Sequence, residues 1–224
     1  MRVKFCGMTS VEDAREAVRL GAWAIGLIHH RPSPRFCEPA VAAEISAAVR
    51  RQTEVVGVFV NASLGEVTEA AENASLSMVQ LHGDEGPAFC REAARRTGCR
   101  VIKAVQVRSA AEVQAAEVFR TDFHLFDAHH PARRGGTGES FDWELLAGRR
   151  SAVPAMLSGG LTPENVAEAI GIVHPNAVDV VSGVEREPGT KDYARMAAFF
   201  EAAQSVSAAT EALHVPDARA RAAP

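Results

Sequence analysis

The sequence predicts one α/β domain, a (β/α)8 TIM barrel of eight parallel strands, over residues 1–203. Three observations predict this fold. Short apolar segments recur roughly every 20 to 30 residues, the length of a strand, a helix and two short loops. Helix-start signals lie between these segments without any hairpin signal, so the strands should be parallel. Two glycine turns near the C-terminal end lie where such barrels bind a phosphate group.

Eight candidate strands can be counted in the 224 residues, a length that suits one barrel. Eight repeats favour the closed barrel over a doubly wound open sheet. After residue 203 the sequence becomes rich in alanine, and we expect residues 204–224 to be a tail, first a frayed helix and then disordered. The strands are centred on Lys4, Ala24, Gly57, Val79, Ile102, Leu125, Ala155 and Val178.

Capping signals mark the ends of several helices. Thr162 followed by Pro163 predicts a helix start, because proline is favoured in the first turn. Gly21 is placed to end the first helix. Three serines are each followed, three residues later, by an acidic residue, and such capping boxes satisfy unpaired backbone N–H groups. These boxes are Ser10 to Asp13, Ser63 to Glu66 and Ser109 to Glu112.

Composition is that of a globular enzyme, with 47% hydrophobic and 23% charged residues. A net charge of −4, with no basic run among aromatic residues, gives no reason to expect nucleic acid binding. The apolar runs are too short to span a membrane, and the N-terminus lacks a signal peptide core. The four cysteines form no CxxC pair, which indicates reduced thiols and a cytoplasmic protein.

The two glycine turns span Ser158–Leu161 and Ser182–Glu185, and each follows a short β-branched strand. Such turns aim several backbone N–H groups at one point, where they can bind a phosphate without a cationic side chain. The sequence therefore predicts a small phosphorylated substrate. Its phosphate-binding residues would be Gly159, Gly160, Ser182 and Gly183.

Polar residues inside the strands also need an explanation, because both faces of a barrel strand are normally apolar. The simplest is that they face the barrel interior, with the last polar residue of each strand at the C-terminal rim, where such enzymes keep their chemistry. The predicted rim residues are Cys6, His82 and Asp127. The predicted deeper residues, whose charges should pair with one another, are Lys4, Lys103 and Asp179.

Each polar residue has a structural alternative. Cys6 is either a small buried core residue or a reactive thiol. Lys4 favours the second interpretation, because a nearby cation lowers the pKa of a thiol. His82 is either a structural or a functional histidine, and both interpretations stay open. Lys4, Lys103 and Asp179 fit structural ion pairs better than catalysis.

Two long loops follow predicted strands. Residues 26–36 carry Arg35 after two prolines, and a rigidly held arginine can bind a carboxylate through two hydrogen bonds. A solvated surface arginine is the alternative. Residues 128–140 include Gly135–Gly138, which could close over a substrate or be a flexible insertion.

Metal ions and nucleotide cofactors are not expected. The pairs His29–His30 and His129–His130 lack metal-binding spacing, because adjacent histidines in an extended loop point apart. Neither GxGxxG nor GxxxxGK[ST] occurs, so nothing indicates a dinucleotide or a nucleoside triphosphate.

Motifs along residues 2–200 resemble those of the phosphoribosylanthranilate isomerases of tryptophan biosynthesis. One motif alone would be weak evidence, but the occurrence of all these motifs in the same order along one chain is specific to this family. Val181 departs from the family pattern, which often has a second serine there, and the tail has no counterpart. The matching segments are Lys4–Thr9, Pro32–Arg35, Val58–Asn61, Gln80–Gly83, Phe126–Asp127, Gly135–Gly138, Phe141–Trp143, Leu157–Leu161, Val178–Val180, Ser182–Glu185, Pro188–Gly189 and Lys191–Asp192.

The resemblance implies roles for particular residues. Cys6 would be the general base, Asp127 the general acid, and Arg35 the residue that binds the anthranilate carboxylate. No cofactor and no metal are implied. The predicted substrate-binding residues are Arg35, His82, Gly136, Gly159, Gly160, Ser182 and Gly183.

The implied reaction is an Amadori rearrangement of N-(5-phosphoribosyl)anthranilate to 1-(o-carboxyphenylamino)-1-deoxyribulose 5-phosphate. Asp127 could protonate the ring oxygen only if its pKa were raised. Three alternatives stay open: another sugar-phosphate isomerase or epimerase, an aldolase or decarboxylase with Lys103 as a Schiff-base nucleophile, and a non-catalytic phosphate-binding barrel subunit. Both a monomer and a homodimer fit the sequence.

Overall fold

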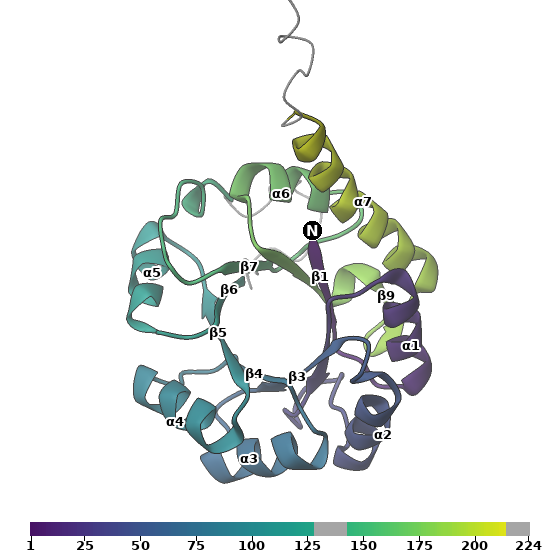
Figure 1. Ribbon diagram of the computed structural model, residues 1–224, viewed down its shortest axis with the longest axis vertical. Coiled ribbons are helices and arrows are strands. Elements are labelled where there is room, and N and C mark those ends of the chain that lie inside the picture. Colours follow the sequence, from purple (N-terminus) through teal and green to yellow (C-terminus); the bar gives the residue numbers. More distant parts are fainter. Residues whose placement is uncertain (128–142, 214–224) are drawn as a thin grey trace, which may run out of the picture.

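Eight parallel strands close into a barrel in the order β1 to β8, so the predicted fold is confirmed (Figure 1). The computed structural model describes residues 1–127 and 143–213. All eight predicted strand centres fall inside the observed strands. These are β1 (Arg2–Cys6), β2 (Ala24–Ile28), β3 (Glu54–Phe59), β4 (Met78–Leu81), β5 (Arg100–Gln106), β6 (Phe123–Asp127), β7 (Ala155–Ser158) and β8 (Ala177–Val180).

Helices surround the barrel and cover its outer face (Figure 1). Ser10 accepts a hydrogen bond from the Asp13 N–H, Ser63 and Glu66 form a complete capping box, and Gly21 ends the first helix with a φ of 92°. The described helices are α1 (Val11–Leu20), α2 (Pro39–Val49), α3 (Leu64–Asn73), α4 (Pro87–Thr97), α5 (Ala110–Ala115), α6 (Val166–Val173) and α7 (Tyr193–Leu213), with short 3-10 helices η1 (Ala116–Val118), η2 (Trp143–Leu145) and η3 (Ser182–Val184).

Two local predictions were wrong. Helix α6 begins at Val166 rather than beside Pro163, although Thr162 does cap the turn before it, since Thr162 Oγ1 accepts from the Glu164 N–H at 3.3 Å. A hairpin also exists, although no hairpin was expected. Strands β9 (Glu185–Glu187) and β10 (Thr190–Lys191) pair antiparallel between β8 and α7. The Pro188-Gly189 pair between the two strands is a common turn dipeptide.

The barrel interior is filled by alternate side chains of the strands. Lys4 and Asp179 occur among them as a buried ion pair, with Lys4 Nζ 2.7 Å from Asp179 Oδ1, as the sequence predicted. The apolar residues of this interior cluster are Ala24, Val56, Met78, Ile102, Ala104, Phe123, Leu125, Met156 and Ala177.

Lys103 does not face the interior, which corrects the sequence-based expectation. It lies between Ile102 and Ala104, both of which belong to the interior cluster, so the alternation of the strand places it on the outer face. There Lys103 Nζ lies 2.8 Å from Glu85 Oε2 and 2.6 Å from the Gly83 carbonyl oxygen. A lysine in this position cannot serve as a Schiff-base nucleophile in the barrel mouth.

Replacing Lys4 with methionine is expected to lower the free energy of unfolding by about 3–5 kcal/mol, because the Asp179 carboxylate would stay buried without its cation. Urea denaturation followed by circular dichroism measures this change. Arg19→Met is the matched control, since Arg19 pairs with Glu16 on α1 but its side chain is 66% exposed. We expect no measurable change for the control. Equal effects of both substitutions would contradict the prediction.

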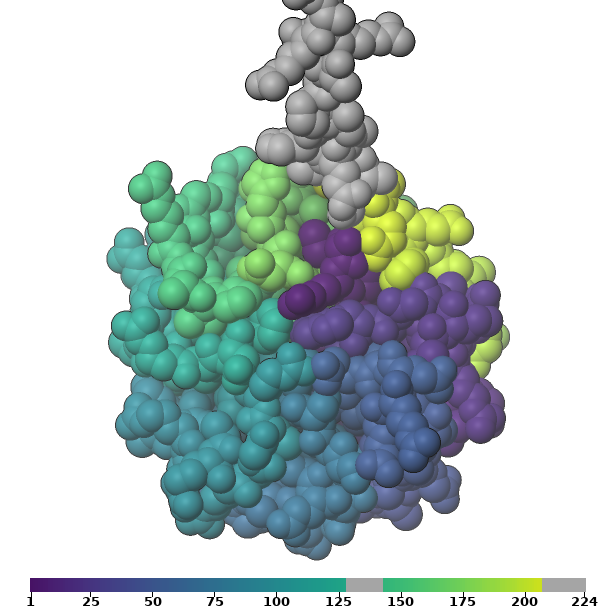
Figure 2. Space-filling view, in the orientation of Figure 1, coloured from purple at the N-terminus to yellow at the C-terminus, as the bar shows by residue number. Residues whose placement is uncertain are grey.

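The last described helix lies against the beginning of the chain (Figure 2). The Met1 amino group donates to Gln204 Oε1 at 2.7 Å, and Gln204 Nε2 donates to the Met1 carbonyl oxygen at 2.7 Å. Helix α7 continues to Leu213. The expected disorder of the tail concerns residues 214–224, which lie outside the described residues. No helix in the described part of the chain is long and apolar enough to cross a membrane.

Candidate active site

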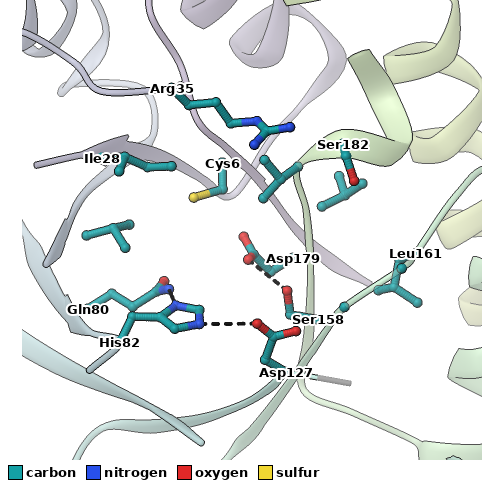
Figure 3. A pocket seen from close by; sticks show the side chains of 15 residues that line it. Cys6, Ile28, Arg35, Gln80, His82, Asp127, Ser158, Leu161, Asp179 and Ser182 are labelled. Atoms are coloured by element: carbon teal, nitrogen blue, oxygen red, sulfur yellow. Dashed lines mark hydrogen bonds and ion pairs between the residues drawn. The ribbon is translucent and has the colours of Figure 1, made fainter. Parts of the chain in front are cut away.

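The C-terminal ends of the strands surround a cavity of about 280 Å³. The two rim residues from β1 and β6, Cys6 and Asp127, both line it, together with the first glycine turn and Ser182 of the second (Figure 3). Ile28 and Val58 contribute apolar surface from β2 and β3. Most of the predicted site residues therefore converge on one cavity, although β1 and β6 lie on different sides of the barrel, whereas Gly183 is not among the residues that line it.

Cys6 ends β1 and is buried, with 3% of its surface exposed. Burial raises the pKa of the Cys6 thiol above its ordinary value of 9.0, because the low-dielectric surroundings disfavour the thiolate. The charges of Lys4 and Lys191 act in the opposite direction but are outweighed. Lys4 thus lowers the pKa of Cys6, as expected, but burial raises it by more, so the expected net decrease is wrong.

We expect the Cys6 thiolate to appear only above pH 9 in the free protein. Deprotonation forms the charged species that burial disfavours, so the raised pKa shifts ionisation to higher pH. The ultraviolet absorbance of the thiolate, taken as the difference between the unaltered protein and Cys6→Ala over a pH titration, isolates this group from the other cysteines. A difference signal already present at pH 7 would contradict the prediction.

Asp127 ends β6 and takes part in a hydrogen-bonded chain with two residues of β4 and the loop after it (Figure 3). His82 Nε2 lies 3.2 Å from Asp127 Oδ2, and Gln80 Nε2 lies 2.9 Å from His82 Nδ1. The donor in each of these two hydrogen bonds depends on the tautomer of the His82 ring. In either tautomer one proton lies between His82 Nε2 and Asp127 Oδ2.

The first glycine turn has a backbone that only glycine adopts readily. Gly159 and Gly160 have φ angles of 88° and 64°, in the left-handed region. The Gly160 carbonyl oxygen accepts from Asn165 Nδ2 at 3.0 Å. A carbonyl oxygen would repel an anion, and here it is bonded to a side chain of the turn that precedes α6.

The second glycine turn packs directly against the first. A Cβ atom at Gly183 would collide with the backbone carbonyl oxygen of Leu161, so no other residue fits there. The Gly183 carbonyl oxygen accepts from Arg195 Nε at 2.9 Å. The two turns thus form one continuous backbone surface beside the cavity, with at least one carbonyl of each bonded to a side chain.

Arg35 lines the cavity from the loop after β2. Ser33 Oγ accepts from the Arg35 N–H at 3.1 Å, which helps to fix the loop. The guanidinium group is bound by Glu185, with Nε 2.9 Å and Nη2 2.6 Å from Glu185 Oε2. Only 19% of the Arg35 side chain is exposed, so it is a held residue rather than a solvated surface arginine.

Some residues around the cavity had no role assigned from the sequence. Ser158 Oγ donates to Asp179 Oδ2 at 3.1 Å at the floor of the cavity. Glu185, from the unexpected hairpin, binds Arg35, and Lys191 from the same hairpin binds Glu185. In the sequence, Glu185 and Lys191 are two opposite charges in a short segment. The alternation of side chains along a strand does not indicate that these charges lie near Arg35.

The remaining predictions about this site concern a loop and metal ions. Gly136 and the rest of segment 128–142 lie outside the described residues, and so does His129–His130. Within residues 1–127 and 143–213, no group of three or more histidine, cysteine, aspartate or glutamate side chains is arranged to bind a metal ion.

A (β/α)8 barrel with a cavity at the C-terminal ends of its strands belongs to a class of enzymes that keep their active site there, often with a phosphate site in the loops after strands 7 and 8. Comparison with known proteins narrows this class. The family model for N-(5'-phosphoribosyl)anthranilate (PRA) isomerase matches residues 3–202. The chain therefore belongs to the PRA isomerase family, and the resemblance noted in the sequence is confirmed.

Relatives and solved structures agree with the family match. An N-(5'-phosphoribosyl)anthranilate isomerase from Geobacter sulfurreducens is 45% identical over 91% of this chain and 98% of its own length. A crystal structure of the isomerase from Thermotoga maritima is 41% identical, with a TM-score of 0.85, and covers 92% of this chain and 99% of its own. Another, in complex with reduced 1-(o-carboxyphenylamino)-1-deoxyribulose 5-phosphate, is 38% identical with a TM-score of 0.81 and covers 92% and 99%.

Proposed function

We propose that this isomerase converts N-(5'-phosphoribosyl)anthranilate to 1-(o-carboxyphenylamino)-1-deoxyribulose 5-phosphate, a step of tryptophan biosynthesis, with Cys6 as base and Asp127 as acid. One observation carries the assignment of these residues. Cys6, Asp127 and the glycine turns line the same cavity on a chain of this family. The reaction is an internal hydrogen shift, so it requires no external oxidant or reductant.

The first step opens the ribose ring. Asp127 gives a proton to the ring oxygen as the C1–O bond breaks, and the anthranilate nitrogen lone pair forms an iminium with C1. For this step the proton of the hydrogen bond between Asp127 Oδ2 and His82 Nε2 belongs to the Asp127 carboxyl group, and the His82 ring nitrogen accepts it. General acid catalysis of this kind contributes about 10² to 10⁴ in rate.

The second step moves a proton from carbon. The iminium acidifies the C2–H bond, the Cys6 thiolate removes that proton, and the electron pair forms the C1–C2 double bond of an enolamine. Tautomerisation to the ketone, with protonation at C1, completes the rearrangement. Because the thiolate is the minor form of the free protein at neutral pH, the charges of Lys4 and Lys191 have a direct use in stabilising it.

The substrate is held at both ends in this proposal. Its phosphate binds the amides of Gly159, Gly160, Ser182 and Gly183, and its carboxylate binds Arg35. The ring-opened sugar is flexible, so fixing both ends positions C1 and C2 between acid and base. His82 contacts the substrate beside Asp127, and Gly136 is a further substrate-binding residue in this proposal.

Arg35→Met is expected to raise KM about 10- to 100-fold with a smaller effect on kcat, because the lost charge-assisted hydrogen bonds act mainly on binding. Steady-state kinetics measures both constants. Arg31→Met is the matched control, since Arg31 lies on the same loop but its guanidinium stacks on Phe36 outside the cavity, 5.1 Å from the ring centroid. An unchanged KM for Arg35→Met would remove Arg35 from the carboxylate site.

The activity itself is tested with purified protein and freshly prepared N-(5'-phosphoribosyl)anthranilate, followed by loss of substrate fluorescence. We expect conversion without added metal or cofactor. Absence of turnover by folded protein, or turnover of another sugar phosphate in preference, would contradict the proposed function.

We further propose that the protein works in the cytoplasm, as a monomer or a homodimer. The four thiols, three of them buried, fit a reducing compartment. The relative from Thermotoga maritima is dimeric. Light scattering at micromolar concentration distinguishes the two assembly states.

A further inference from the structure

The hairpin β9–β10 places two oppositely charged side chains behind the cavity. Glu185 and Lys191 are register partners across the hairpin. Their side chains are 3% and 0% exposed, respectively. Charges this deeply buried are costly to keep unless each is paired, so their partners show what the hairpin does.

The partners belong to the proposed catalytic site. Glu185 accepts from Arg35 Nε and Nη2 and, at 3.0 Å, from Lys191 Nζ. Lys191 Nζ also donates to the carbonyl oxygens of Cys6 at 2.7 Å and Val181 at 3.3 Å. The hairpin thus connects Arg35, the end of β1 and the strand end before Ser182.

The geometry of the guanidinium group leaves one edge for a ligand. A guanidinium can bind carboxylates through two different pairs of N–H groups. Glu185 occupies the pair on Nε and Nη2. The edge formed by Nη1 and Nη2 is the one that a ligand carboxylate would use, and Arg35 lines the cavity.

Charge presents a difficulty that Lys191 resolves. Arg35 paired with Glu185 alone would be neutral overall, and the Glu185 carboxylate would repel an incoming anion. Lys191 adds a second cation against the same carboxylate. Two cations and one anion leave one net positive charge, in surroundings where water screens charges poorly.

We propose that Lys191 determines specificity for the carboxylate of the substrate, because it neutralises Glu185 and so keeps Arg35 effective as a cation. Lys191 does not touch the substrate in this proposal; it is a positioning residue that acts through Glu185 and Arg35. The inference rests on the proposed function, in which Arg35 binds the anthranilate carboxylate.

The test compares two stable ligands by calorimetry. One is reduced 1-(o-carboxyphenylamino)-1-deoxyribulose 5-phosphate, and the other is the same compound without the ring carboxyl group. The ratio of their Kd values measures the preference for the carboxylate, independent of the thiol and of the chemical step. Affinity for the second ligand also reports whether the cavity and the phosphate site are intact.

Lys191→Met is expected to reduce the preference about tenfold. Glu185→Gln in the same chain should then restore it to within about threefold of the unaltered protein, because Arg35 is again left with a net positive charge. The loss of the bonds to Cys6 and Val181 is the same in both variants, so a structural role of Lys191 cannot produce this recovery. Arg186→Met, an exposed charge of the same strand, is the matched control and should change nothing.

Other outcomes would overturn the inference. It fails if Lys191→Met keeps the preference, or if the double variant is no better than the single one. If Lys191→Met does not fold, the Glu185→Gln variant alone tests the inference. Its preference for the ligand with the carboxyl group should equal or exceed that of the unaltered protein. A clear loss of that preference contradicts the inference. If Arg35→Met keeps the full preference, the proposed carboxylate site is what fails.

Discussion

Cys6→Ala is expected to lower kcat by about 10² to 10⁴, because the reacting C2 proton would lose its base. Cys6→Ser should be nearly as inactive, since a serine hydroxyl ionises far less readily than a thiol and a buried oxyanion is still more costly. Steady-state kinetics at saturating substrate measures the loss. Binding of a reduced product analogue shows whether the cavity persists.

Cys90→Ala is the matched control for this substitution. Cys90 is also a buried thiol, but it lies on α4, outside the cavity. Its replacement should leave kcat within about twofold once the folded fraction is considered. Turnover by Cys6→Ala within about threefold of the unaltered protein would exclude Cys6 as the base.

Asp127→Asn is expected to cause a similar loss, about 10² to 10⁴ in kcat. An amide keeps the size of the carboxyl group and can still accept from His82 Nε2, but it has no acidic proton for the ring oxygen. The fall should therefore appear in kcat with little change in the affinity for the reduced product analogue.

Asp122→Asn provides the control, because Asp122 directly precedes the same strand at its other end. Asp122 accepts from the Val101 N–H at 2.8 Å and has no part in the cavity. We expect normal kcat per folded molecule. If Asp127→Asn were equally harmless, the acid would have to be another group.

The barrel could be predicted because its determinants are local. Strand length, helix caps such as Ser63 with Glu66, and the spacing of the apolar segments are readable over short stretches of sequence. The rim residues Cys6 and Asp127 followed from the same rule, since a polar residue at the end of a barrel strand has few other uses. The family motifs supplied their roles.

The errors concern interactions between distant segments. Lys103 was assigned to the interior because every polar residue inside a strand was expected to face the interior, whereas its neighbours Ile102 and Ala104 and its partner Glu85 show that it lies on the outer face. The Cys6 pKa depends on the balance between burial and two lysines, one of them 185 residues away in the sequence. Patterns in a single sequence show neither the face of the strand on which Lys103 lies nor the balance of effects on the pKa of Cys6.

The hairpin β9–β10 shows the same limit. Pro188 and Gly189 were noted only as part of a family motif, and strands of three and two residues are too short for a periodic signal. The convergence of Glu185 and Lys191 on Arg35 spans about 150 residues of sequence. Such a cluster becomes visible only once the barrel has closed.

The contact between Gly183 and the Leu161 carbonyl has a consequence for the closure of the barrel. It packs the loop after β7 against the loop after β8, next to the place where β8 pairs with β1 and closes the barrel. An anion bound by both loops would link them and stabilise their packing. Inorganic phosphate alone should then slow hydrogen exchange in the C-terminal third of the fold, whether or not any sugar is attached.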